Sequence, residues 1–217
     1  MSHSEGIPMA RAGRKRTKST GVRALNREDR ATALLRAARI VAEFNDGKPQ
    51  CIERVALLDR VADLLHVRVE PVPVAVAVQG PVGSCLLGEA VNGVIPLIPG
   101  GTMKRSPSSD LWNGAGHLFL FTPQEGMLLD PTLDQVGPAT GYPRGCLIML
   151  VTADRLYSED LTFEVAGSVT VLYRVVRADT NWRTAYNGQC ARLGRQARTV
   201  ARRALELEGF DEDLIPE

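Results

Sequence analysis

The order of apolar patterns along the chain constrains its fold more than any other feature. Residues 27–44 and a second segment beginning near 49–51 carry apolar side chains at the spacing of amphipathic helices. Beyond residue 67 the pattern changes to short apolar runs between turn residues, which is typical of strands. Helices followed by mainly antiparallel strands predict an α+β domain with N-terminal helices packed on the sheet. A long amphipathic helix is expected to close the chain, with one face formed by Cys190, Leu193, Ala197, Val200, Ala201, Ala204 and Leu207.

The sequence also predicts where the individual strands lie. The Val-, Ala- and Pro-rich run 67–78 predicts a buried extended segment. His66, just before it, sits where a helix ends and a left-handed residue or a cation is favoured. Further strands are predicted at 116–122, 126–130, 145–151, 161–165 and 168–176. Residues 80–114 are rich in Gly, Pro and Ser and predict a long, partly structured loop without a regular element, a kind of segment that often forms a lid or a binding loop.

Length and composition predict one domain with two extensions. The chain has 217 residues, of which 44% are hydrophobic and 24% charged, as in ordinary globular proteins. We expect a disordered basic tail over 1–25, a domain over 26–210 and an acidic C-terminal tail over 211–217. The chain contains neither an apolar run of about 18 residues nor a signal-peptide pattern. We therefore expect a cytoplasmic protein without membrane contact.

Charge is concentrated at the N-terminus. Residues 1–23 contain six Lys and Arg against the single acid Glu5, although the net charge of the whole chain is only +1. A body without a large field of one sign gives little support to strong nucleic-acid binding by the domain. Residues 11–23 can be a solvated extension, or an arm that touches nucleic acid or an acidic partner weakly.

The four cysteines are widely spaced. No Cys-x-x-Cys pair occurs, and the chain has only three histidines. Zinc sites usually need close pairs of ligands, so we expect no metal site, and no other cofactor is predicted. In a reducing compartment these cysteines are expected to be free thiols.

Strand parity brings a histidine and a carboxylate together. His117 lies in the apolar run 116–122, and residues 127–130 return after the turn sequence Pro-Gln-Glu-Gly. If these four residues form the loop, Phe119 pairs with Asp130, and Asp130 shares a face with His117. A carboxylate there can accept a hydrogen bond from the imidazole and fix its tautomer, whereas a loop of odd length would separate the two groups.

Cys51 completes a set of nucleophile, base and orienting acid. It follows Lys48-Pro49-Gln50 at the predicted start of a helix, where free N–H groups and the macrodipole favour a thiolate. A cationic imidazole beside it would stabilise that thiolate further. The backbone N–H of Cys51, helped by Gln50, is then the candidate oxyanion donor.

Cys51 at a helix start, the GHLFLF strand at 116–121 and the DPTLDQ motif at 130–135 resemble the transglutaminase-like branch of the papain-like cysteine enzymes. The resemblance implies a papain-like core in which Cys51 is the nucleophile, His117 the base and Asp130 the orienting acid. Pro49 stands where the family's common Gly-Gln-Cys signature has Gly. The family includes peptidases, acyltransferases that crosslink proteins, and amidases, so the implied reaction is acyl transfer from a protein or peptide through a thioester.

The sequence is also compatible with several alternatives. Cys190, in Gly-Gln-Cys-Ala, matches the signature better than Cys51 but follows the His and the Asp, so we favour Cys51. Trp112 in the long loop and Gln135 in the DPTLDQ motif are further candidates for substrate or oxyanion contacts, although Trp112 can equally be a packing residue. The domain can also be a catalytically inactive binding module, or a nucleic-acid-associated protein that uses its basic tail.

Overall fold

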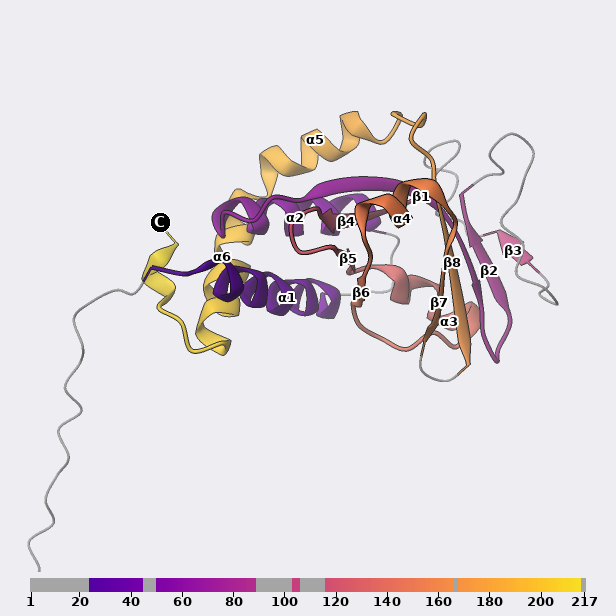
Figure 1. Cartoon of the computed structure of the whole chain (residues 1–217), viewed down its shortest axis with the longest axis horizontal. Coiled ribbons are helices and arrows are strands. Elements are labelled where there is room, and N and C mark those ends of the chain that lie inside the picture. The colour runs from indigo at the N-terminus through magenta and orange to yellow at the C-terminus, as the bar shows by residue number, and fades with distance from the viewer. Residues whose placement is uncertain (1–23, 45–49, 89–102, 106–115, 166–167, 216–217) are drawn as a thin grey trace, which may run out of the picture.

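A computed structural model describes residues 24–44, 50–88, 103–105, 116–165 and 168–215. They form an α+β structure, as predicted, with a layer of helices on one side and a curled sheet on the other (Figure 1). The helices are α1 (Arg27–Glu43), α2 (Cys51–Leu64), α3 (Gly137–Thr140), α4 (Ala153–Ser158), α5 (Arg183–Arg192) and α6 (Gly194–Leu207), with 3-10 turns η2 (Leu133–Val136) and η3 (Glu212–Leu214). The strands are β1 (Glu70–Gln79), β2 (Ser84–Leu87), β3 (Met103–Arg105), β4 (His117–Thr122), β5 (Met127–Asp130), β6 (Leu147–Leu150), β7 (Leu161–Val165) and β8 (Val169–Val175).

Local sequence accounts for the first two helices. Asn26 and Asp29 form a reciprocal capping box that begins α1. The helix α2 begins at Cys51 and ends at Leu64. Just after it, His66 has a positive φ of 55°, the left-handed conformation expected after a helix end. The apolar faces of α1 and α2 pack together and against α6 and the sheet. The helix layer is therefore a consequence of amphipathic periodicity.

The strand β1 organises the sheet. Val74 pairs with His117 of β4 on one side and with Val175 of β8 on the other, and Val76 pairs with Leu87 of β2 and with Tyr173 of β8. Because β8 occupies one edge of β1 at both positions, β4 and β2 must follow one another along the opposite edge. The strands β5 and β6 extend the sheet beyond β4, and β7 pairs with β8.

The alternating side chains of β4 divide the core in two. Leu118 and Leu120 face α2 and belong to the core between helices and sheet. Phe119 and Phe121 face the other way, into a second core enclosed by the curled sheet, where Tyr173 stacks edge-on against Phe119 at 5.3 Å between ring centroids. His117 shares the parity of Phe119 and is fully buried.

The structure corrects three expectations. The segment 80–114 is not only loop, because Ser84–Leu87 is a buried strand on β1 and Met103–Arg105 pairs with it in parallel. The closing helix is two helices, since the chain bends at Leu193 before Gly194, a poor helix former. Residues expected to begin an acidic tail instead form η3, and Ile215 is buried with its carbonyl accepting from Arg202. Three apolar residues between Ser84 and Gly88 are too short a signal to predict β2.

Gly116→Ala should strongly destabilise the fold. Gly116 has φ +70°, and a Cβ there would lie 2.2 Å from the backbone nitrogen of Gly88, at the junction of β2 and β4. We expect a loss of about 3 kcal/mol or more in the free energy of unfolding, measured by urea denaturation. Gly188→Ala in α5, where a Cβ would meet nothing within 4 Å, is the control and should be neutral or slightly stabilising. Equal stability of both variants would contradict this account of the junction.

Candidate functional site

The hairpin β4–β5 has the register that parity predicted. Thr122 pairs with Met127 across a four-residue turn, and Leu120 pairs with Leu129, so Phe119 lies opposite Asp130. Asp130 therefore lies diagonally beside His117 on the same face of the sheet. The two side chains, both fully buried, are joined by a hydrogen bond of 2.7 Å between Nε2 of His117 and Oδ2 of Asp130. Because an ionised carboxylate only accepts, the proton lies on Nε2.

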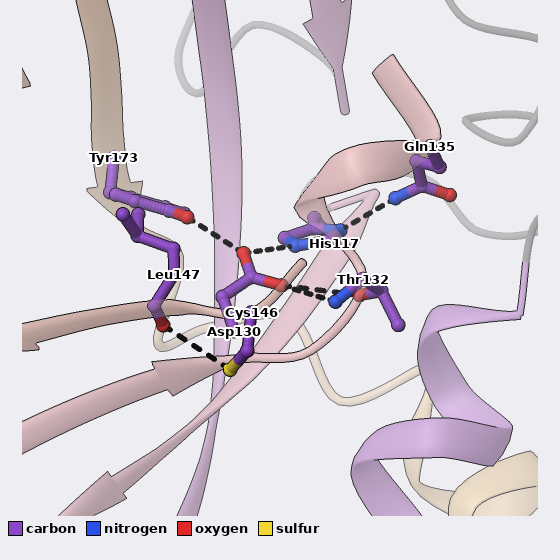
Figure 2. A network of polar contacts seen from close by, with 7 residues as sticks. All are labelled: His117, Asp130, Thr132, Gln135, Cys146, Leu147 and Tyr173. Atoms are coloured by element: carbon purple, nitrogen blue, oxygen red, sulfur yellow. Dashed lines mark hydrogen bonds and ion pairs between the residues drawn. The ribbon is translucent and has the colours of Figure 1, made fainter. Parts of the chain in front are cut away.

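Three more donors hold the Asp130 carboxylate. Oδ1 accepts from the backbone N–H of Thr132 at 3.0 Å and from its hydroxyl at 3.2 Å. Oδ2 accepts from the hydroxyl of Tyr173 at 2.7 Å, beside its bond to His117. Figure 2 shows Tyr173 and His117 approaching Oδ2 from different sides, while Thr132 lies against the other carboxylate oxygen, Oδ1. A buried charge is tolerated when its acceptor sites are filled in this way.

The same contacts set the protonation of the pair. Burial would raise the pKa of Asp130, but the His117 charge and the hydrogen bonds from His117, Tyr173 and Thr132 outweigh it and hold the pKa below its usual value. Burial would also lower the pKa of His117. The Asp130 charge and hydrogen bond, together with a hydrogen bond and a charge from Cys51, instead raise it to about 10. The pair is accordingly an imidazolium and a carboxylate at neutral pH.

Cys51 reaches the ring from the helix layer. It is the first residue of α2, which packs across β4, and its side chain is 5% exposed. A hydrogen bond that the Cys51 sulfur accepts from the ring is among the causes that raise the pKa of His117, so the sulfur lies within interaction range of the ring. The site thus combines a thiol at a helix start, an imidazole on one strand and a carboxylate on the next.

Of the other predicted site residues, the structure describes Gln135 and Gln50. Gln135, on η2, lies against the other ring nitrogen of His117, with its Nε2 3.1 Å from Nδ1. Gln50 precedes α2, and its side-chain oxygen accepts from Arg54 at 3.5 Å. Trp112 and the basic segment 11–23 lie outside the described residues.

Sequence reasoning missed two residues that touch Asp130. Thr132 could have been found, because Asp followed two residues later by Thr is a local pattern in which the carboxylate accepts from the backbone. Tyr173 carries no such signal. It lies 43 positions from Asp130, on β8, and the curled sheet (Figure 1) brings the two side chains together.

The three remaining cysteines lie in different surroundings. Burial raises the pKa of the Cys85, Cys146 and Cys190 thiols, which favours the unreactive protonated form. Cys190 is half-buried on α5 with its sulfur 4.0 Å from Asp59 of α2, which also accepts from Tyr186. Of the four thiols, Cys51 is the one whose interaction shifts His117.

Comparisons with models of protein families, with curated proteins and with solved structures find no match to this chain. Among the described residues, no three His, Cys, Asp or Glu side chains are grouped so that they could hold a metal ion. No helix in this described part is long and apolar enough to cross a membrane.

Tyr173→Phe tests the contribution of the tyrosine hydroxyl to the site. The variant keeps the ring that stacks on Phe119 but removes a donor from a fully buried carboxylate. We expect a loss of about 1–3 kcal/mol in unfolding free energy, measured by urea denaturation. Tyr157→Phe, whose hydroxyl bonds to Glu70 at the surface, is the control and should change stability by less than about 0.5 kcal/mol. Similar losses in both variants would refute a special role for Tyr173.

The raised pKa of His117 predicts a loss of stability in alkali. A group that is protonated more tightly in the folded state stabilises it fully below its unfolded pKa, here 6.5, and this contribution disappears as pH rises to about 10. We expect the unfolding free energy to fall over this window in the wild type. In Asp130→Asn, where the Asp130 charge is gone and only Cys51 still opposes the effect of burial on the ring, the difference between pH 6.5 and 10 should shrink markedly. An unchanged pH dependence in this variant would show that the pair is not its source.

Proposed function

We propose that this chain is a cysteine-dependent acyl hydrolase or acyltransferase with a papain-like, transglutaminase-like core, acting on amide bonds of proteins or peptides. The observation that carries the proposal is the convergence of three groups. A buried His117–Asp130 pair with an imidazolium at neutral pH meets a thiol at the first residue of a helix. These are the parts that nucleophilic acyl transfer requires.

Each group has one part in the reaction. The Cys51 thiolate attacks the amide carbonyl, forming a C–S bond, while the free N–H groups at the start of α2 stabilise the charge on the oxygen. The C–N bond then breaks, and Nδ1 of His117 gives its proton to the leaving amine. Asp130 keeps Nε2 protonated and the ring oriented throughout. Water or a second amine, deprotonated by Nδ1, then attacks the thioester carbon. The C–S bond breaks, the acyl group leaves on the new oxygen or nitrogen, and the Cys51 thiolate and the imidazolium are restored.

The burial of the site favours one second candidate. Cys51 is 5% exposed and His117 is fully buried, so a substrate reaches the sulfur only if neighbouring groups move. A domain that retains the three residues for structure and serves as a protein-binding module would have the same burial. The two functions differ in whether Cys51 forms a covalent bond with an acyl donor.

An activated ester tests the enzymatic function directly. Incubation of the full chain with p-nitrophenyl acetate should acetylate Cys51, detected by intact mass and peptide mapping, and hydrolysis should then restore the free thiol. Added primary amine should accelerate release if the protein is an acyltransferase. Cys190→Ala is the matched control and should retain full acetylation, whereas Cys51→Ala should lose it.

Alkylation measures the activation of the thiol independently of any acyl donor. We expect His117→Ala to slow the reaction of Cys51 with iodoacetamide at pH 6.5 by about tenfold or more, because the proposed reaction requires His117 to take the proton of the thiol. The same rate with and without His117, or acetylation confined to another cysteine, would rule out the proposed catalytic set. A folded Cys51→Ala variant that keeps its binding partners would support the binding module instead.

A further inference from the structure

Gln135 occupies the ring nitrogen of His117 that the chemistry needs. Its carboxamide nitrogen lies 3.1 Å from Nδ1, on the opposite side of the ring from Asp130 (Figure 2). The residue lies on η2, which begins at Leu133 soon after β5 ends at Asp130, so one short segment supplies both Asp130 and Gln135. His117 is therefore held at both nitrogens by residues five positions apart in the sequence.

The oxygen of the same carboxamide is left without a role in this orientation. Oε1 of Gln135 is buried and has no hydrogen-bond partner among the described residues. A buried acceptor without a partner is unfavourable, because the hydrogen bonds that it made to water in the unfolded chain are not replaced. The nitrogen and oxygen of a carboxamide exchange places by a half-turn about the last side-chain bond. The half-turned side chain would place Oε1 on Nδ1.

The two orientations match the two protonation states of the ring. Since Nε2 keeps its proton for Asp130, only Nδ1 gains and loses one. Neutral imidazole presents an acceptor at Nδ1 and is matched by the amide N–H; imidazolium presents a donor and is matched by Oε1. The raised pKa of His117 favours the second state at neutral pH, in which an amide nitrogen would face another donor.

We propose that Gln135 is a positioning residue that follows the proton on Nδ1, accepting through Oε1 from the imidazolium and donating through its N–H to the neutral ring. The inference rests on the proposed function for its place in a reaction, because acyl transfer moves this proton on and off Nδ1. In each state the carboxamide keeps the ring in the plane set by Asp130. The Cys51 thiol interacts with the same ring, so Gln135 shares the region of Nδ1 with the nucleophile and the leaving group.

Two substitutions separate this role from simple packing. Gln135→Met keeps the length of the side chain and removes the acceptor, while Gln135→Glu provides an acceptor that never donates when ionised. In full-length protein labelled with ¹⁵N-histidine, the titration midpoint of His117 should fall in Gln135→Met and rise in Gln135→Glu, each by about one pH unit. Gln124→Met and Gln124→Glu, on the exposed turn of the same hairpin, are the matched controls and should leave the midpoint unchanged.

The titration of His117 tests the role of Gln135 independently of whether Cys51 is acylated. The other titratable groups near the pair are unchanged in all four variants: Cys51 of α2, Tyr173 of β8, and Asp134, Tyr142 and Cys146 after β5. Opposite shifts in a protein that is never acetylated would retain the role of Gln135 toward the ring and reject the enzyme. Acetylation of Cys51 with no shift beyond the Gln124 controls, or shifts in the same direction for Met and Glu, would overturn the inference alone.

Discussion

The fully buried carboxylate of Asp130 is the constraint on which the rest of the site depends. An isolated charge at this depth would be strongly unfavourable, so the fold must surround it with donors. It does so from three places: His117 on β4, Thr132 just after β5 and Tyr173 on β8. The requirement ties β8 to the hairpin across β1, and it keeps the imidazole protonated and oriented. The stabilisation of the buried Asp130 charge thereby links the curl of the sheet to the protonation of the His117 ring.

The strand β1 explains where the site forms. Its first half pairs with β4 and its second half with β2, so the two strands meet end to end along one edge. Gly116 and Gly88 touch at that junction, and His117 is the next residue. The start of β4 is thus fixed by close backbone packing that only glycine allows. A histidine placed there is positioned by the sheet itself, while α2, packed across the same strand, brings its first residue toward the ring.

The arrangement assigns different tasks to the two sides of His117. On one side, Asp130 fixes the tautomer through a short bond between buried partners. On the other side, Cys51 and Gln135 converge on the region where the proton changes, one as a thiol and one as a neutral amide. A neutral amide can hold the ring in both charge states, which an acid or a base in that position could not. In the proposed reaction, this division assigns proton transfer to Nδ1.

The sequence alone determined what depends on local periodicity and parity. Alternation and a four-residue turn were enough to place Asp130 beside His117, and helix signals were enough to begin α2 at Cys51. The tertiary structure decided the rest: β2 on the second half of β1, the break at Leu193, and the contacts of Tyr173 and Gln135. The physical reason is the separation along the sequence between the residues that interact. Local patterns report which face a side chain occupies, whereas partners from separate elements are chosen by how the sheet curls and which buried polar groups need donors.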